Sequence, residues 1–140
     1  MGNNLYKNLH LFKGDIRKKE DLINLFKKVK SQGKSFSAVI HLAGLKSVQD
    51  SILHPIKYWE FNVQGTINLV QVMNAFNCRT IVFSSSASVY GTTNKLFLNE
   101  DDPIKPINPY AMTKFVIEKF LNDLSLNSKE IWKIANLRYF

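Results

Sequence analysis

The sequence predicts an α/β protein built on a doubly wound parallel sheet. Short apolar runs alternate with longer segments in which apolar residues recur at helical spacing, and no internal repeat or low-complexity linker interrupts the alternation. Strands joined through helices need crossover connections, which are right-handed and leave the strands parallel, with helices over both faces of the sheet. With 140 residues and 45% hydrophobic content, the chain is expected to form one domain with a packed core.

Four short apolar segments are expected to be the strands of this sheet. They are residues 9–12, 37–42, 80–84 and 132–139. The first runs into Gly14 and Asp15 and the second into Ala43 and Gly44, so turn-forming or small residues mark their ends. Ligands of open parallel sheets bind beyond the carboxyl ends of the strands, so these ends are the first place to look for a site.

Three longer segments are expected to be helices. Residues 18–33 carry an apolar stripe closed by Gly33, residues 56–76 carry a second stripe, and a third helix covers 109–124. Pro109 stands in the first turn of the third helix, where its missing N–H costs no hydrogen bond.

Composition excludes several classes of protein. The formal net charge is +8, but the basic residues cluster at 17–19 and 27–30 around an apolar helical stripe, which indicates a solvated helix face and no nucleic-acid partner. No apolar run is long enough to span a membrane. A single cysteine, Cys78, excludes an internal disulfide and favours a cytoplasmic location.

The segment after the third predicted strand carries the strongest functional signal. Ser84, Ser85 and Ser86 end that strand, and Tyr110 and Lys114 stand four residues apart on the next helix. Positions i and i+4 share one helix face, so the Lys114 ammonium can lie beneath the Tyr110 phenol. A neighbouring cation lowers the pKa of a phenol from its ordinary value near ~10, which makes the pair a general acid/base. The alternatives are surface residues of an amphipathic helix and ordinary hydroxyls at a strand end.

Five segments, in order and near the expected spacing, resemble the extended short-chain dehydrogenase/reductase family. They are Gly14-Asp15-Ile16, residues 41–48 (His-Leu-Ala-Gly-Leu-Lys-Ser-Val), residues 84–91 (Ser-Ser-Ser-Ala-Ser-Val-Tyr-Gly), Tyr110-x-x-x-Lys114 and the closing Leu137-Arg138-Tyr139-Phe140. Within the family they are most similar to the enzymes that epimerise nucleotide sugars. The resemblance implies a Rossmann-type fold, NAD as cofactor and a UDP-hexose as substrate. It also implies interconversion of UDP-glucose and UDP-galactose by epimerisation at C4, in a full-length protein that is a homodimer.

The resemblance also implies residue roles. Tyr110 is the acid/base, Lys114 holds its pKa down and binds the nicotinamide ribose, and the third serine, Ser86, contacts the substrate together with Tyr110. The cofactor-binding positions implied are Asp15, Ile16, Leu42, Ala43, Gly44, Lys46, Tyr110, Lys114 and Phe140.

Several positions keep a second interpretation. Asp15 precedes a helix and competes as its N-cap, and Lys46 competes as a solvated lysine. His41 is expected to be a core histidine, and no histidine has partners that suggest a metal site. The family asparagine that touches the cofactor falls at Phe61 in this chain, so that contact is not expected.

The sequence lacks two features of the family. No Gly-x-x-Gly-x-x-Gly turn occurs, and with it the acidic residue for the adenosine ribose is absent. A substrate-binding lobe would follow Phe140. We therefore expect residues 1–140 to be a partial NAD-binding domain, truncated at both ends and weakly active or inactive alone. The alternatives are another nucleotide-sugar epimerase or decarboxylase, or a non-catalytic remnant; a 4,6-dehydratase generally carries Thr-Asp-Glu where this chain has Ser84-Ser85-Ser86.

Overall fold

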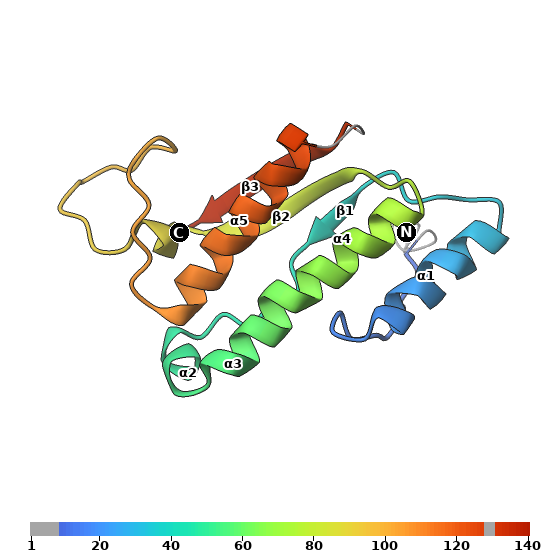
Figure 1. Cartoon of the computed structure of the whole chain (residues 1–140), viewed down its shortest axis with the longest axis horizontal. Coiled ribbons are helices and arrows are strands. Elements are labelled where there is room, and N and C mark those ends of the chain that lie inside the picture. Colours follow the sequence, from blue (N-terminus) through green and yellow to red (C-terminus); the bar gives the residue numbers. More distant parts are fainter. Residues whose placement is uncertain (1–8, 128–130) are drawn as a thin grey trace, which may run out of the picture.

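The computed structural model describes residues 9–127 and 131–140 as alternating helices and strands (Figure 1). In chain order the elements are α1 (Lys19–Ser31), β1 (Val39–His41), α2 (Val48–Leu53), α3 (Pro55–Tyr58), the π-helical segment η1 (Trp59–Gln64), α4 (Gly65–Ala75), β2 (Thr80–Ser86), the 3₁₀ turn η2 (Ala87–Tyr90), α5 (Pro109–Asn127) and β3 (Lys133–Tyr139).

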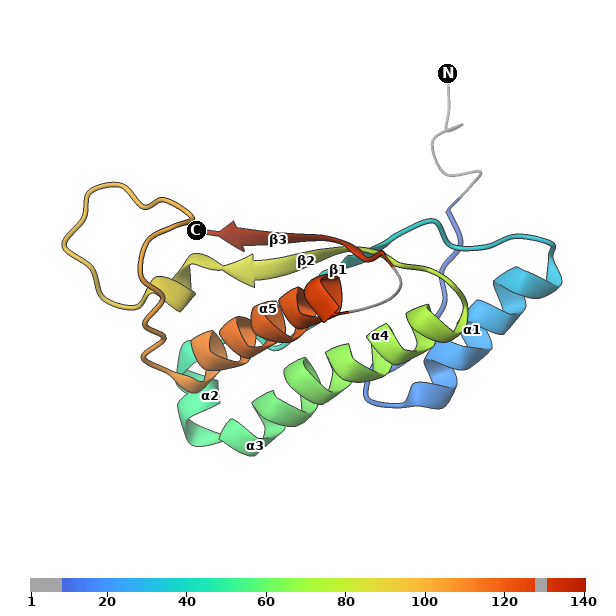
Figure 2. The same cartoon turned by 45° about the horizontal axis from the view of Figure 1, so that its top comes forward.

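The three strands form one parallel sheet in the order β1-β2-β3. Ile40 of β1 is the register partner of Val82, and Val82 is in turn the partner of Ala135 in β3. Both crossovers run through helices, so the predicted α/β class with a parallel sheet is confirmed. Figure 2 shows α1, α4 and α5 on the same side of the sheet, so within the described residues the expected second helical layer is not seen.

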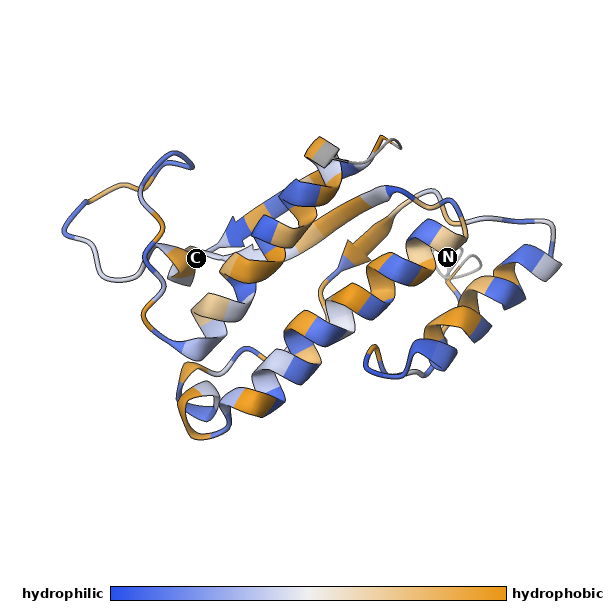
Figure 3. Cartoon of the chain, viewed as in Figure 1, coloured by the Kyte–Doolittle hydropathy of each residue, from blue (hydrophilic) through white to orange (hydrophobic). Residues whose placement is uncertain are grey.

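The core lies between the sheet and these three helices. It is a single cluster of buried side chains: Leu22, Phe26, Leu69, Val70, Val72, Met73, Cys78, Ile81, Phe83, Ile117, Leu121 and Trp132. Side chains alternate along β2, so Ile81, Phe83 and Ser85 are buried beneath the helices while the residues between them are half-buried. The helices show the matching amphipathic pattern, with mixed polar and apolar residues along α1 and α4 (Figure 3).

The prediction of a strand over residues 9–12 is wrong. This segment is irregular, and Leu9 and Leu11 are 70% and 98% exposed. A strand exists through its ladder of hydrogen bonds to a neighbour, and no described strand lies beside this segment. The apolar pattern predicted the type of element, but pairing decides whether the element forms.

The helices and the other strands follow the sequence closely. The helix expected over 18–33 is α1, whose first turn carries Glu20 and Asp21 and whose last turn carries Lys28 and Lys30, in agreement with the helix dipole. The helix expected over 56–76 is divided into α3, η1 and α4, because the chain widens to π-helical geometry between Trp59 and Gln64. The short helix α2 was not predicted.

Gly91 closes the turn after β2 in a conformation that only glycine adopts easily, with φ 68° and ψ −147°. A Cβ at this position would lie 2.1 Å from the carbonyl oxygen of Lys105. Gly91→Ala is therefore expected to lower the free energy of unfolding by about 3 kcal/mol or more, since backbone strain of about 1–3 kcal/mol adds to the overlap. Urea unfolding measures the loss.

Gly33→Ala is the matched control for this prediction. Gly33 also has a positive φ of 70°, but a Cβ there meets nothing within 4 Å. Its substitution should cost about 1–2 kcal/mol from backbone conformation alone. Equal losses for the two variants would contradict the role of the Lys105 contact.

Candidate active site

The carboxyl edge of the sheet brings β2 and the start of α5 together. The Nζ atom of Lys114 donates a hydrogen bond of 2.7 Å to the backbone oxygen of Ser84, near the end of β2. The same Nζ lies 4.8 Å from the ring centroid of Phe83 and 5.9 Å from that of Tyr110, one helical turn earlier. The helix that carries Tyr110 is thereby held against the end of the strand that carries the serines.

Lys114 is a buried cation. The residue is only 5% exposed, and burial lowers its pKa from 10.5 to about 8. An ammonium has three N–H donors, and the Ser84 carbonyl uses one of them. The remaining donors are available to a ligand at the edge, and the positive charge favours an anionic oxygen nearby.

Ser85 and Ser86 have different environments. Ser85 is 3% exposed and donates to the Glu118 carboxylate of α5, so its hydroxyl is used inside the protein. Ser86 is the N-cap of η2, and its Oγ accepts from the backbone N of Ser88 at 3.2 Å and from the Ser88 hydroxyl at 2.9 Å. Because the Ser86 oxygen already accepts two hydrogen bonds, its own O–H stays available as a donor to a substrate oxygen.

Tyr110 and Ser86 are not bonded directly. Within residues 9–127 and 131–140, no hydrogen bond joins the Tyr110 hydroxyl to Ser86 or to Lys114. Side chains alternate along β2, so Ser86 lies on the side of the strand opposite the buried Ser85. A substrate oxygen bound there would be the shared partner of both groups.

Asn62 joins the turn after β1 to the Tyr110 helix. Its side chain, 1% exposed, accepts from the backbone N of Leu45 at 2.8 Å and donates to the Leu45 oxygen at 3.1 Å. It also donates to the Thr113 hydroxyl at 3.1 Å, and that hydroxyl donates to the backbone oxygen of Tyr110 at 2.7 Å. Sequence analysis missed this role; the available signal was a carboxamide in the middle of an apolar helical stripe.

His41 is a core histidine, as predicted. It is 3% exposed, its Nε2 lies 2.9 Å from the Thr66 hydroxyl, and burial lowers its pKa to about 4. Thr66 donates its single proton to the backbone oxygen of Asn62 at 2.5 Å, so it must accept from His41. The ring is therefore neutral with the proton on Nε2, and it stabilises the start of α4.

The turn over residues 42–46 is open where it faces the edge. Leu42, Ala43 and Lys46 are exposed, whereas a Cβ on Gly44 would meet Asn62 Oδ1 at 3.2 Å and Lys114 Nζ at 3.6 Å. The glycine lets the backbone pass close to the buried ammonium. The turn and the free Lys114 donors fit the nicotinamide ribose of a dinucleotide, a ligand with hydroxyl acceptors.

Asp15 and Ile16 lie beside the start of α4, away from Tyr110. The Arg17 guanidinium hydrogen-bonds the Asp15 carboxylate, with its Nη2 at 2.6 Å, and lowers the pKa of Asp15 to about 2. The N-cap of α1 is Lys18, so the N-cap interpretation of Asp15 is wrong. A Cβ on Gly65 would lie 2.7 Å from Ile16 carbons, so the Ile16 side chain is engaged in packing.

Phe140 lies at the carboxyl end of β3 and is 97% exposed. The predicted contacts of Asp15, Ile16 and Phe140 with a cofactor stay predictions.

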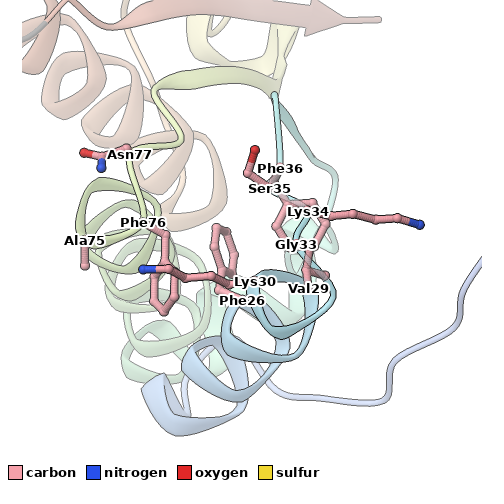
Figure 4. Close-up of a pocket in the computed structure, with 10 residues that line it drawn as sticks. All are labelled: Phe26, Val29, Lys30, Gly33, Lys34, Ser35, Phe36, Ala75, Phe76 and Asn77. Atoms are coloured by element: carbon pink, nitrogen blue, oxygen red, sulfur yellow. The ribbon is translucent and has the colours of Figure 1, made fainter.

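A cavity of about 440 Å³ lies at the opposite, amino edge of the sheet (Figure 4). Its wall contains Phe26, with ring centroids 4.7 Å from Phe36 and 5.3 Å from Phe76. Lys30 turns toward Phe76, while Lys34 points away from the cavity. The carboxyl ends of α1 and α4 border this space with partial negative charge, which disfavours the phosphates of a dinucleotide.

A family model described as GDP-mannose 4,6 dehydratase matches residues 2–140. The chain belongs to that family. Within the part of the chain that the structure describes, no group of three or more acidic, histidine or cysteine residues is arranged to hold a metal, and no helix is both long and apolar enough to cross a membrane.

Relatives and solved structures that resemble this chain include proteins named 4-epimerases. A pea protein (Pisum sativum), the bifunctional UDP-glucose 4-epimerase and UDP-xylose 4-epimerase 1, is 46% identical over 140 residues, which is 100% of this chain and 38% of the pea protein. UDP-glucose 4-epimerase from Bifidobacterium longum, in complex with NAD+ and UDP, matches with a TM-score of 0.84 and 37% identity over 92% of this chain and 37% of that chain. The UDP-Glc/GlcNAc 4-epimerase from Campylobacter jejuni matches with a TM-score of 0.86 and 31% identity over 96% of this chain and 39% of that chain.

These findings confirm the predicted resemblance to nucleotide-sugar epimerases. They also show that the chain spans only about 38% of the length of the curated relatives it matches.

The buried Lys114 predicts a pH dependence of stability. Its pKa is about 8 in the folded state and 10.5 in the unfolded chain, the ordinary value of a lysine, so between these values the unfolded state binds more protons and stability rises with pH. Between pH 7.5 and 9.5 the wild-type chain should gain about 2 kcal/mol relative to Lys114→Met in urea unfolding.

Lys27→Met is the control, because Lys27 is exposed on α1. It should follow the wild-type pH dependence. A Lys114→Met curve parallel to the wild-type curve over this range would show that Lys114 keeps an ordinary pKa.

Proposed function

We propose that this chain supplies the proton-transfer half of an NAD-dependent UDP-glucose 4-epimerase, the isomerase that interconverts UDP-glucose and UDP-galactose. The observation that carries the proposal is the buried Lys114 ammonium, fixed on Ser84 beside the Tyr110 ring at the end of the serine strand. The relatives named 4-epimerases support it. As the chain spans 38% of such a relative, the activity belongs to the longer protein.

Tyr110 is the general acid/base in this mechanism. The positive charge of Lys114 stabilises the phenolate, which takes the proton from the C4 hydroxyl of the sugar. The free O–H of Ser86 donates to the same C4 oxygen and holds it in place. After the resulting 4-keto sugar turns over in the site, Tyr110 returns the proton to an alkoxide of inverted configuration.

NAD would supply the hydride acceptor and donor at C4 when bound. The residues that would hold its nicotinamide half are Lys114 and the open turn of Leu42, Ala43, Gly44 and Lys46, with Asn62 fixing that turn. Asp15, Ile16 and Phe140 are proposed as further contacts. The glycine-rich turn that binds the pyrophosphate is absent from residues 1–140, so these contacts hold only part of a dinucleotide.

Another nucleotide-sugar epimerase or decarboxylase of the same family is the second candidate function, because relatives include enzymes named for UDP-xylose and for GlcNAc. The serine run at 84–86 argues against a 4,6-dehydratase, since it carries no carboxylic acid.

A homodimer and a cytoplasmic location stay predictions.

Tyr110→Phe removes the proton-transfer group. In the longer protein that carries this chain, the substitution should lower kcat by roughly 10²–10⁴-fold, because no other group replaces the phenol. A coupled assay of UDP-galactose formation measures the effect. Lys27→Met changes an exposed side chain on α1 and should keep kcat near the wild-type value. Near wild-type turnover of Tyr110→Phe would remove Tyr110 as the acid/base.

The polypeptide of residues 1–140 should bind NAD weakly and turn over UDP-sugar poorly or not at all. Without the backbone N–H groups of a glycine-rich turn, the pyrophosphate loses its main contacts, and we expect a Kd above about 1 mM. Calorimetric titration with NAD, beside a coupled epimerase assay, tests this expectation. Tight binding with turnover would reveal a second phosphate-binding arrangement within these residues.

A further inference from the structure

A buried polar network joins α5 to both strands beneath the active-site edge. Glu118 of α5 is 6% exposed, and its carboxylate accepts from the hydroxyl of Ser85 in β2. Arg138 of β3 donates to the same carboxylate, through Nη2 at 2.8 Å and through Nε at 3.1 Å. These hydrogen bonds raise the pKa of Arg138 above its ordinary value, so the guanidinium stays charged.

The three groups are aligned by the sheet itself. Ser85 and Arg138 are register partners in the parallel pair of β2 and β3, and both reach Glu118 on α5. One carboxylate therefore bridges two neighbouring strands from the helix above them. A bidentate arginine fixes the carboxylate in orientation as well as in distance.

Lys114 provides a second hydrogen bond between α5 and β2, one helical turn before Glu118. Its Nζ binds the Ser84 oxygen, and Glu118 binds Ser85, so consecutive residues of β2 hold consecutive turns of α5. A helix rises about 5.4 Å per turn. A shift of α5 along β2 by even a fraction of a turn would break both the Lys114–Ser84 and the Glu118–Ser85 hydrogen bonds.

The network also reaches the turn that follows Ser86. Arg138 Nη1 donates to the Tyr90 hydroxyl at 2.7 Å and to the backbone oxygen of Glu100 at 3.0 Å. Tyr90 is 5% exposed and ends η2, the turn that Ser86 caps. Arg138 thus ties the serine-bearing turn to the helix that carries Tyr110.

We propose that Glu118 and Arg138 are positioning residues that set the axial position of α5 on β2, and with it the place of Tyr110 relative to Ser86. This inference rests on the proposed function only in naming Tyr110 as the proton-transfer group. Glu118 and Arg138 touch no reacting atom. They act through hydrogen bonds, Glu118 with Ser85 and Arg138 with Tyr90, beneath the carboxyl edge of the sheet.

Glu118→Asp tests the inference in the longer enzyme. Aspartate keeps the charge but is shorter by one methylene, so it should draw α5 out of position by about 1 Å when it retains Arg138. A misplacement of that size lowers kcat on the order of 10²-fold, while KM stays within about threefold because the binding groups remain. Glu20→Asp, an exposed position on α1, is the matched control and should leave both constants unchanged.

Glu118→Gln and Ser85→Ala complete the kinetic series. Glutamine keeps the length but presents an NH₂ donor where the carboxylate accepts from Arg138, so it breaks the bidentate pair and should lower kcat at least as far as aspartate does. Ser85→Ala removes one hydrogen bond to Glu118 and leaves the ion pair, so its loss of kcat should be smaller but in the same direction. A loss of kcat in Glu118→Asp no larger than in Glu20→Asp would overturn the proposal.

A measurement without turnover separates this proposal from the epimerase proposal. In the chain of residues 1–140 labelled with ¹³Cε-lysine, the Lys114 resonance should titrate near pH 8, with Lys114→Met as the assignment control. In Glu118→Asp the midpoint should move toward 10.5, because a displaced Lys114 gains water and is relieved of the burial that lowers its pKa. An unchanged midpoint in both Glu118→Asp and Ser85→Ala would overturn the positioning role, whatever the wild-type enzyme catalyses.

Discussion

The packing of α5 against β2 connects the apolar core of this protein to its polar edge. Ile117 and Leu121 share one buried cluster with Ile81 and Phe83. The same helix and the same strand also exchange polar contacts through Lys114 and Glu118. The apolar contacts hold the helix on the sheet, and the polar contacts set its position. Apolar burial is non-directional, so the polar contacts have to supply the placement.

Burying these polar groups costs free energy, and each cost is offset locally. Nine polar residues are buried, including His41, Asn62, Lys114 and Glu118, yet within the described residues no buried side-chain nitrogen or oxygen lacks a hydrogen-bond partner. A well-packed apolar side chain of similar size would serve stability at least as well as a buried ion pair. Lys114 and Glu118 lie where α5 meets the end of β2, which indicates a requirement for geometry there. The π-helical segment η1 fits the same requirement, since it places the Asn62 side chain between the turn at Leu45 and the helix at Thr113.

The sequence was a reliable guide wherever a local pattern decides the outcome. β2 and α5 carry strong strand and helix patterns, and the four-residue spacing of Tyr110 and Lys114 is a local property of a helix. Contacts between residues on different elements leave no such local pattern in the sequence. Glu118 and Arg138 lie 20 residues apart on different elements, and periodicity indicates the face each occupies but not the residue it meets. The prediction of a strand over residues 9–12 was wrong for the same reason, because an apolar pattern predicts a strand only when a neighbouring strand is present to pair with it.

The uncovered face of the sheet gives the last constraint on how this chain works. Ile40 on β1 and Leu42 just after it are 69% and 66% exposed, and Leu137 and Tyr139 on β3 are 40% and 54% exposed. Parallel sheets in α/β proteins are covered on both faces, and a row of exposed apolar side chains on one face is unfavourable in water. The groups proposed for proton transfer stand at the end of β2, beside the helix-covered face of the sheet. Under the proposed function, the hydrogen bonds on the helix side of this edge fix these groups, while the opposite face of the sheet carries exposed apolar side chains.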